Sequence, residues 1–326
     1  MLFIVIIIDF YRGMWYTLKK AYIGIVMSYL SISKELKRIY GCKVYKIALS
    51  ADMSCPNRDG TKGLGGCIFC NCSGDFAVRK KTSIKSQIED AIRLVENKNK
   101  SGKYIAYFQS GTNTYASCQK LSSIFRKAIN NEKIVALSIG TRPDCLPDNV
   151  LSLLEKLNKI KPVWVELGLQ TKFDETAKFI RRGFELSEYE SAVKKLKSIG
   201  ITVITHMIIG LPFETKEMIV ETARYIGKSG VDGIKFHLLH ILEDTDLAEI
   251  YRKGIFKTLE LDEYVDILKE CVEVIPPDMV IHRLTGDGWK KKLISPLWSG
   301  DKKKVLNTIN KYFELNNVNQ GSKFFD

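Results

Sequence analysis

The sequence has little of what a membrane or exported protein needs. No window of its 326 residues approaches the roughly 18 consecutive apolar residues of a membrane-spanning helix. The apolar run at residues 1–8 has no basic residues before it and no small-residue cleavage pattern soon after it, so it does not fit a signal peptide. A polytopic membrane protein is excluded, and we expect a cytoplasmic protein without stable membrane insertion.

Proline is also scarce, with 8 residues, whereas 45% of the chain is hydrophobic and 27% is charged. This composition excludes disorder over most of the chain and indicates a packed globule. Residues 1–33 are the exception. We interpret them as an N-terminal extension outside the fold, or as the product of an upstream start codon with the functional start near Met27. A peripheral anchor is the alternative.

Acidic residues are outnumbered: 50 Lys and Arg stand against 37 Asp and Glu, which leaves a formal charge of +13. Lysine triplets lie at 290–292 and 302–304, and Arg79, Lys80 and Lys81 follow a cysteine-rich segment. This balance fits a polyanionic partner such as a nucleic acid, although lysine runs are commonly solvated faces.

The eight cysteines are unevenly spread, and four of them lie between residues 55 and 72. A chain of this length can bury an adequate core without disulfides. Bunched cysteines in a chain without an export signal indicate a metal site in a reducing compartment.

Short β-branched runs alternate with amphipathic stretches through most of the chain. The expected strands are 44–49, 104–108, 134–139, 163–169, 201–209 and 233–239. The helical patterns between them are 83–97, 118–130, 147–159, 185–199 and 216–228. Six β/α units in succession predict a parallel sheet covered by helices, and the nearly continuous apolar strands agree with burial on both faces. We predict an α/β fold, namely an incomplete (β/α)6 barrel of the TIM type.

The pattern changes after the sixth strand. Helices are expected at 247–252, 261–275 and 301–315, with a short strand at 279–282. We expect the tail from Asn316 onward to be frayed. The predicted organisation is the extension at 1–33, a partial barrel with the cysteine loop at 34–245, and a small, basic α/β extension at 246–326.

The strongest functional signal is the segment CPNRDGTKGLGGCIFC, in which Cys55, Cys67 and Cys70 have the spacing C-x11-C-x2-C. It follows the first strand, at the end of the barrel where β/α barrels carry their active sites. A structural zinc site needs four ligands, and Cys72 is the nearest fourth candidate. Three ligands instead leave one iron of a 4Fe-4S cluster open to a small molecule. The residues favour the cluster and leave zinc as the alternative.

Several motifs besides this loop resemble one family. They are YFQSGTNTYA at 107–116, LSIGTRPDCLPD at 137–148, VELGLQT at 165–171, HMIIGLPFET at 206–215, KFHLLHILEDTDLAEIY at 235–251 and HRLTGDGWKKKLISPLWS at 282–299. The chain resembles radical S-adenosylmethionine (SAM) enzymes of the Elp3-like group, most closely the YhcC/YtqA (MnmL) type. The resemblance runs from about Leu36 to Tyr312.

The resemblance implies a 4Fe-4S cluster held by Cys55, Cys67 and Cys70, whose open iron is chelated by SAM. One electron from the reduced cluster cleaves SAM into methionine and a 5′-deoxyadenosyl radical, and flavodoxin or ferredoxin is the kind of partner that supplies that electron. The expected SAM contacts are Gln109, Thr112, Asn113, Arg142, Glu166, Gln170, Arg182 and His206. No catalytic residue is predicted beyond these ligands.

Some of these assignments also have reasons in the residues themselves. Glu166 and Gln170 have the same parity on one strand, so both should point into the barrel, where a buried polar group needs a partner such as SAM. The guanidinium of Arg142 suits a carboxylate, but the alternative is a pair with Asp144. His206 either lines the cavity or is a hydrogen-bonded core residue.

The cluster motif does not name the substrate. Elp3-like and YhcC/YtqA-type proteins are connected with modification of the tRNA wobble uridine. The resemblance and the basic charge together predict a radical SAM enzyme that modifies the C5 substituent of that base. One alternative is a radical SAM enzyme that acts on a small metabolite or a protein. Another is a non-catalytic iron–sulfur or zinc protein that binds RNA or senses redox state.

Overall fold

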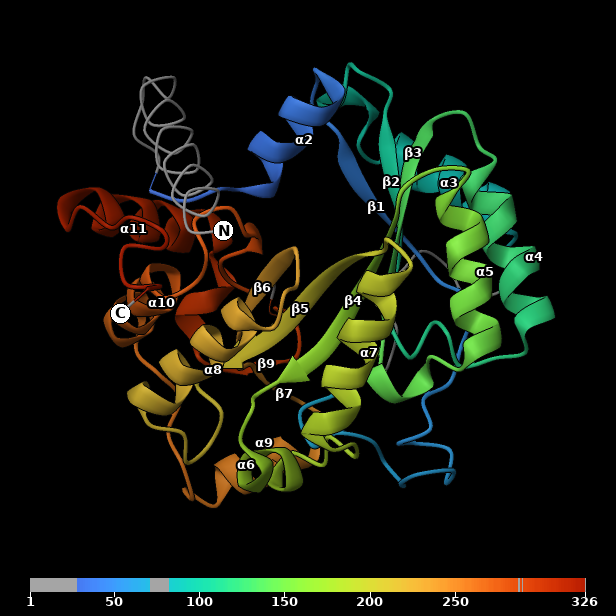
Figure 1. Cartoon of the computed structure of the whole chain (residues 1–326). Helices are drawn as coiled ribbons and strands as arrows, with labels where there is room; N and C mark the ends of the chain where they lie inside the picture. The colour runs from blue at the N-terminus through green and yellow to red at the C-terminus, as the bar shows by residue number, and fades with distance from the viewer. Residues whose placement is uncertain (1–27, 71–81, 287, 289, 326) are drawn as a thin grey trace, which may run out of the picture.

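The computed structural model describes residues 28–70, 82–286, 288 and 290–325. Its centre is a curled sheet of seven parallel strands in the order β1-β2-β3-β4-β5-β6-β8 (Figure 1). The strands are β1 (Tyr45–Leu49), β2 (Tyr104–Phe108), β3 (Ile134–Thr141), β4 (Val163–Gln170), β5 (Thr202–Ile209), β6 (Gly233–Leu238) and β8 (Val280–Arg283). A curled sheet that does not close is an incomplete barrel, so the predicted fold class is confirmed. None of the helices in the described ranges is long and apolar enough to cross a membrane.

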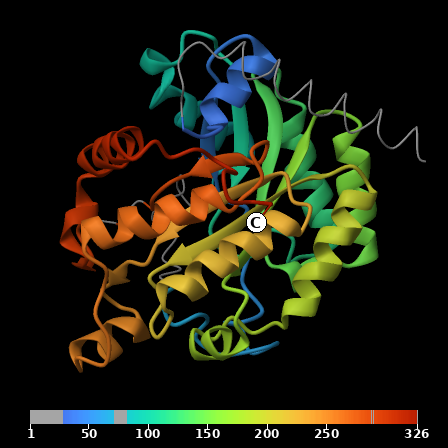
Figure 2. The same ribbon diagram turned by 60° about the vertical axis from the view of Figure 1, so that its left-hand side comes forward.

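Helices cover the outer face of the sheet (Figures 1 and 2). They are α3 (Ile84–Arg93), α4 (Cys118–Ile129), α5 (Asp148–Asn158), α7 (Leu186–Ser198), α8 (Lys216–Lys228) and α10 (Leu261–Glu273), and α11 (Lys302–Leu315) packs on α10. The hydroxyls of Ser83, Ser117 and Thr215 each accept a backbone N–H of the helix that follows, which is why α3, α4 and α8 begin where they do. Each helix turns an apolar stripe to the sheet, as Leu121 and Phe125 do on α4.

The six strands expected from the sequence are present, and their ends differ by at most two residues. The short strand expected in the C-terminal extension is β8, and it joins the sheet in parallel with β6, with Lys235 opposite Arg283. Four residues carry little information about a pairing partner, because pairing depends on tertiary contacts. The C-terminal part therefore contributes to the barrel instead of forming a separate layer.

Helix α2 (Ile32–Tyr40) closes the end of the barrel at which the strands begin (Figure 1). Its Leu36 is buried in an apolar cluster with side chains of β2, β4 and β5, and Ser31 forms an isolated parallel bridge with β8. The last residues of the predicted extension, 28–33, therefore pack onto the fold. Residues 1–27 lie outside the described ranges, so the boundary at residue 33 stays a prediction.

The tail after α11 is packed against the protein, which corrects the expectation of a frayed end. Val318 is buried. The backbone N–H of Gly321 donates to Val272 O at 3.2 Å, and that of Lys323 donates to Glu273 O at 2.8 Å. Both acceptors lie on α10, more than forty residues earlier in the chain, and local polarity gives no sign of such a distant partner.

Loops and short elements gather at the opposite end of the barrel, where the strands finish (Figure 1). They are α6 (Asp174–Phe179), α9 (Asp246–Arg252) and a two-stranded sheet of β7 (Ile241–Leu242) and β9 (Leu293–Ser295). Ile68 of the cysteine loop shares an apolar cluster with Ile180 and Leu247, and Leu247 N donates to Ile68 O at 3.0 Å. These contacts anchor the cysteine loop at the end where β/α barrels carry their active sites.

Candidate functional site

The cysteine loop is a compact segment that follows β1. Cys55, Cys67 and Cys70 have intermediate exposure, and none of them forms a disulfide. The backbone N–H of Cys70 donates to Cys67 O at 2.9 Å, which makes a tight turn between these two ligands. An isolated antiparallel bridge between Asp59 and Leu64 folds the long spacer after Cys55 back on itself.

One glycine of the loop is required by its geometry. Gly66 has a φ of +86°, and a Cβ at this position would lie 2.8 Å from Arg58 Nε. The guanidinium of Arg58 donates to Cys70 O at 2.5 Å. A side chain at position 66 would be strained and would displace the arginine that ties the two halves of the loop together.

Asn57 is a loop residue that the sequence analysis did not single out. Its Nδ2 lies 3.6 Å from Cys67 Sγ and donates to Arg181 O at 2.5 Å. Its Oδ1 is so closely covered that a Cβ on Gly183 would lie 2.6 Å away. An amide N–H beside a cysteine sulfur favours the thiolate, which is the form that binds metals.

The donor set suits an iron–sulfur cluster, in which each cysteine binds a different iron. In the described parts of the chain, no three His, Cys, Asp or Glu side chains converge on one point, as the ligands of a single metal ion must. Cys72, the fourth ligand of the zinc alternative, lies outside those parts. Cys55, Cys67 and Cys70 are therefore the residues that would hold a cluster.

The turn after β2 lies against the segment that leads into the cysteine loop. Thr112 N donates to Ser54 O at 3.1 Å, and Gln109 N donates to Leu49 O at 3.3 Å. Asn113 is fully buried. Its amide donates to the Gly140 carbonyl at 2.9 Å, but its Oδ1 has no hydrogen-bond partner among the residues described. An unsatisfied buried acceptor costs about 1–3 kcal/mol, so this oxygen suits a donor group of a bound ligand.

Gln170 ends β4 in a left-handed conformation with a φ of +70°. The register of β4 with β5 shifts between Gly168 and Gln170, and a Cβ on Gly168 would lie 2.7 Å from Gln170 Nε2. The Gln170 amide therefore folds back over Gly168, whose inward position follows from that of Glu166 two residues earlier. This places a polar amide at the mouth of the barrel.

Arg142 and Arg182 are bound by the protein itself. The guanidinium of Arg182, which is 2% exposed, donates to Thr171 O at 2.7 Å and to Phe184 O at 3.0 Å. Arg142 forms two 2.9 Å bonds to Asp144 and donates to Arg182 O at 2.8 Å. Burial alone would lower the pKa of Arg142, but the bond to Asp144 outweighs burial and raises it.

The pair between Arg142 and Asp144 is the alternative that the sequence analysis considered for this arginine. Together the two arginines clamp the ends of β3 and β4 to the segment that follows α6. We call the turn after β2, Gln170 and this clamp the rim. Direct contacts from either arginine to SAM stay a prediction.

Glu166 lies below the rim, at the centre of a buried charged cluster. Its Oε1 accepts from Lys46 Nζ at 2.6 Å and from Ser138 Oγ at 2.5 Å. Its Oε2 lies 2.7 Å from His206 Nε2 and pairs with Lys235. Burial alone would raise the pKa of Glu166, but the charges of Lys235 and Lys46 hold it well below its usual value. The carboxylate is ionised and satisfied by this chain.

The neighbours of Glu166 are cationic or neutral. Burial lowers the pKa of Lys235 to about 7, although Glu166 opposes this shift. Burial and the charge of Lys235 lower the pKa of His206 to about 4, so its imidazole is neutral at pH 7. His206 stacks on His237 with ring centroids 4.9 Å apart, and His237 Nε2 is buried without a hydrogen-bond partner in the described structure.

The site predicted from the sequence is thus arranged in three layers. They are the loop with Cys55, Cys67 and Cys70, the rim with Gln109, Thr112, Asn113, Arg142, Gln170 and Arg182, and the interior with Glu166 and His206. The sequence analysis missed Lys46 and Lys235. A signal for Lys235 exists, because a lysine within the otherwise apolar run GIKFHL is unusual for a strand buried on both faces.

Known families and proteins with similar sequences identify the family of this chain. The Radical SAM superfamily matches residues 60–226, and the Radical_SAM C-terminal domain matches residues 231–314. Uncharacterized protein YtqA of Bacillus subtilis (strain 168) is 44% identical over 299 residues, which cover 91% of this chain and 92% of that protein. The tRNA uridine(34) acetyltransferase of Methanocaldococcus jannaschii is 28% identical over 48% of this chain and 29% of its own length.

The solved structure of an archaeal Methanocaldococcus infernus Elp3 with an N-terminal deletion superposes with a TM-score of 0.66 and 20% identity. The match covers 85% of this chain and 64% of the Elp3 chain, so this chain spans less than two thirds of that protein. At this identity the likeness concerns the fold. The predicted cofactor class, a 4Fe-4S cluster with SAM, agrees with the matched family. A family match over half of the chain and a relative as similar as YtqA show that this chain belongs to the Radical SAM superfamily.

Proposed function

We propose that this chain is a radical SAM enzyme that modifies the C5 substituent of a tRNA wobble uridine. The observation that carries the radical chemistry is the loop with Cys55, Cys67 and Cys70 at the carboxyl end of the barrel. When bound there, a 4Fe-4S cluster and SAM supply a 5′-deoxyadenosyl radical after one-electron reduction. Asn57 and Arg58 hold the loop in the shape that presents the three sulfurs.

The rim supports SAM binding. The unpartnered Oδ1 of Asn113 suits an amino group, and the inward amide of Gln170 suits polar groups of the same ligand. Gln109 and Thr112 belong to the same turn as Asn113. We assign Arg142 and Arg182 a positioning role, because their guanidiniums already hold the backbone of the rim.

A cleavage assay tests the radical chemistry. With dithionite as reductant, the reconstituted protein should release 5′-deoxyadenosine and methionine. Gln170→Ala should weaken SAM binding about tenfold, as expected for the loss of about 1.4 kcal/mol from one polar contact, without loss of iron. Lys311→Ala, on the distant helix α11, is the matched control. Unchanged SAM affinity in Gln170→Ala would remove this residue from the site. Replacing dithionite by reduced flavodoxin or ferredoxin tests the predicted electron donor.

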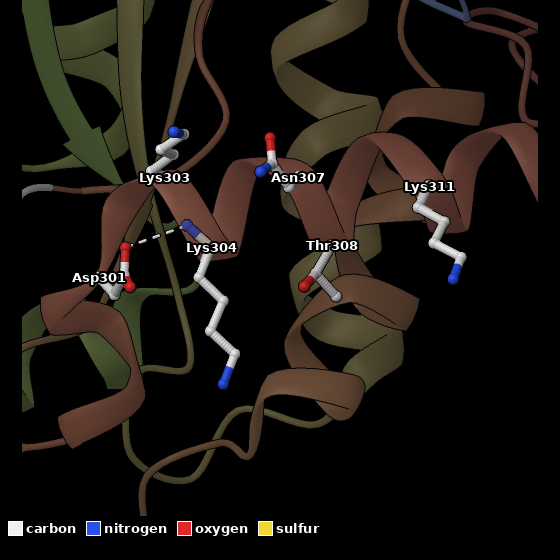
Figure 3. A pocket seen from close by; sticks show the side chains of 6 residues that line it. All are labelled: Asp301, Lys303, Lys304, Asn307, Thr308 and Lys311. Atoms are coloured by element: carbon white, nitrogen blue, oxygen red, sulfur yellow. Dashed lines mark hydrogen bonds between the residues drawn. The ribbon is translucent and has the colours of Figure 1, made fainter.

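The tRNA substrate is supported by the resemblance and by charge. Figure 3 shows the exposed face of α11, where a depression of about 420 Å³ is lined by Asp301, Lys303, Lys304, Asn307, Thr308 and Lys311. No carboxylate of the described residues lies within ion-pair distance of the Lys303, Lys304 or Lys311 ammonium. Unpaired ammonium groups on a surface suit phosphates, which position a nucleic acid without reading its sequence.

Affinity for tRNA across a salt series tests this part. The triple variant Lys303→Ala/Lys304→Ala/Lys311→Ala should show a shallower dependence of log affinity on log salt. The magnitude of that slope should fall by roughly 0.7–0.9 for each phosphate that the variant no longer binds. Mass spectrometry of nucleosides from a strain that lacks the gene should show altered wobble uridines. Salt-independent binding together with unchanged nucleosides would favour a small-metabolite or protein substrate instead.

A further inference from the structure

Two ammonium groups share one carboxylate inside the barrel. Lys46 and Lys235 bind opposite oxygens of Glu166, and no other carboxylate of the described residues lies within ion-pair distance of either lysine. His206 adds no negative charge. The cluster therefore holds more positive than negative groups in an interior where uncompensated charge is costly. Burial lowers the pKa of Lys235, and the charges of Lys46 and Arg283 add to this shift.

Two glycines lie between the cluster and the rim. Gly140 and Gly168 occupy the inward positions that follow Ser138 and Glu166 on β3 and β4. Neither glycine has a side chain that fills the space above the cluster, and the Gln170 amide lies over Gly168. The hydroxyl of Tyr107 lies 3.8 Å from the position of a Cβ on Gly140, so it borders the same space.

Partial exposure of the inward side chains agrees with an accessible cavity. The side chains of Lys46 and His206 are 22% and 18% exposed, whereas those of Lys235 and Glu166 are 5% and 0% exposed. Tyr107 and His237 are also only partly buried. The Lys46 side chain is therefore within reach of a molecule that enters the barrel, while Lys235 and Glu166 lie deeper.

We propose that this cluster is an anion subsite of the substrate cavity, in which Lys46 and Lys235 bind a carboxylate or phosphate group of the substrate. Glu166 fixes both ammonium groups, and the Tyr107 hydroxyl, 3.4 Å from Lys235 Nζ, supplies a further donor. The bound anion balances the second lysine. This inference rests on the proposed function only for the idea that a substrate enters the barrel, and its test needs no radical chemistry.

The test is thermal unfolding of the reconstituted full chain with added anions, at an ionic strength kept constant with a bulky sulfonate buffer. Acetate or inorganic phosphate should raise the midpoint in a saturable way, because a ligand that binds only the folded state stabilises it. Uncharged acetamide should not. Whichever anion saturates at the lower concentration identifies the group as a carboxylate or a phosphate.

Substitutions of the two lysines and of Glu166 show whether these groups bind the anion. Lys235→Met should abolish the saturable shift, and Lys46→Met should raise the half-saturating concentration at least tenfold. The control Lys127→Met, at an exposed position of α4, should change nothing. Glu166→Gln should lower the half-saturating concentration severalfold, because it removes the acid that competes for both lysines. A merely structural role for Glu166 would not tighten anion binding. If Lys235→Met fails to fold, the variant of the partly exposed lysine, Lys46→Met, still shows whether the cluster binds the anion.

Three outcomes overturn the inference. They are no saturable shift in the wild type, an equal shift in the wild type and the lysine variants, and loss of the acetate shift when SAM is saturating. The last result would assign the lysines to the carboxylate of SAM. Absence of SAM cleavage together with a retained, lysine-dependent anion shift would instead overturn the proposed function and leave the subsite in place.

Discussion

The rim and the interior of the barrel compensate buried charge in different ways. At the rim, Arg142 and Arg182 donate to Asp144 and to backbone carbonyls, so the chain itself satisfies each guanidinium. One layer deeper, Lys46 and Lys235 share the single carboxylate of Glu166. The rim is built to keep its shape, whereas the interior has two ammonium groups for one carboxylate, which is why we propose a further acceptor there. The type of a charged residue is therefore a weaker sign of ligand binding than the number of acceptors that already surround it.

The largest expected effect separates the cysteine loop from the interior. Cys67→Ala should lose nearly all of the iron and sulfide that the reconstituted wild type carries, about four irons per chain, because one of three cluster ligands is gone. Iron and sulfide assays measure this. The acetate shift of the interior should persist in the same variant.

Cys271→Ala is the control for this prediction, since Cys271 is buried on α10, outside the cysteine loop. It should keep both iron and sulfide. Stoichiometric zinc without sulfide in the wild type would contradict the predicted 4Fe-4S cluster and favour the zinc site instead.

A second test breaks the clamp of the rim. Arg182→Met should lower the free energy of unfolding by about 3 kcal/mol, because several buried carbonyls lose their donor at once. The neighbouring Arg181→Ala should cost less than about 1 kcal/mol, since Arg181 pairs with Asp246 at the surface. Urea unfolding of both variants measures the difference. Equal losses would show that the rim is not held by the buried arginine.

A smaller effect concerns the pH dependence of the free energy of unfolding, to which Glu214, beside the rim, should contribute. Burial raises the pKa of Glu214 from 4.5 to about 7, and its carboxyl bonds to Thr171 at 2.5 Å. The folded state thus binds this proton more tightly than the unfolded state. Its contribution to stability is complete below pH 4.5 and is lost as the pH rises through about 7.

Glu214→Gln should remove that loss. Between pH 4.5 and 7 the wild type should lose about 2.5 kcal/mol relative to the variant, since one pK unit corresponds to about 1.4 kcal/mol and part of the total loss lies outside these limits. Unfolding free energies at a series of pH values measure the gap. Parallel curves for the two proteins would show that Glu214 does not titrate differently on folding.

Much of the fold could be predicted because its signals are local. Continuous apolar runs such as Val163–Gln170 mark buried strands, and parity along that strand predicts that Glu166 and Gln170 both face inward. Two features could not be predicted in the same way. The pairing of the expected short strand β8 with β6 and the packing of helix α2 depend on partners far away in the chain, and no pattern within a few residues reports such partners.

The candidate site also has one part with local signals in the sequence and one part without them. Three cysteines and their glycines within sixteen residues indicate a metal-binding loop, because the ligands and the turns that position them are close in sequence. Arg142 and Arg182 are predicted to contact SAM for an equally local reason, since a guanidinium suits a carboxylate, and this stays a prediction. The partners that the structure adds within the chain are mostly backbone carbonyls, which are present in every sequence and therefore give no signal.

The sequence by itself determined the alternation of strands and helices, the cysteine loop and the family to which the chain belongs. Only the tertiary structure decided which buried charges are satisfied. Lys46, Glu166 and Lys235 come from three different strands, and Glu166 is 120 residues from Lys46 and 69 from Lys235. Periodicity depends on neighbours along the chain. Charge compensation depends on distances between groups from separate strands in an interior of low dielectric constant, and those distances exist only after folding.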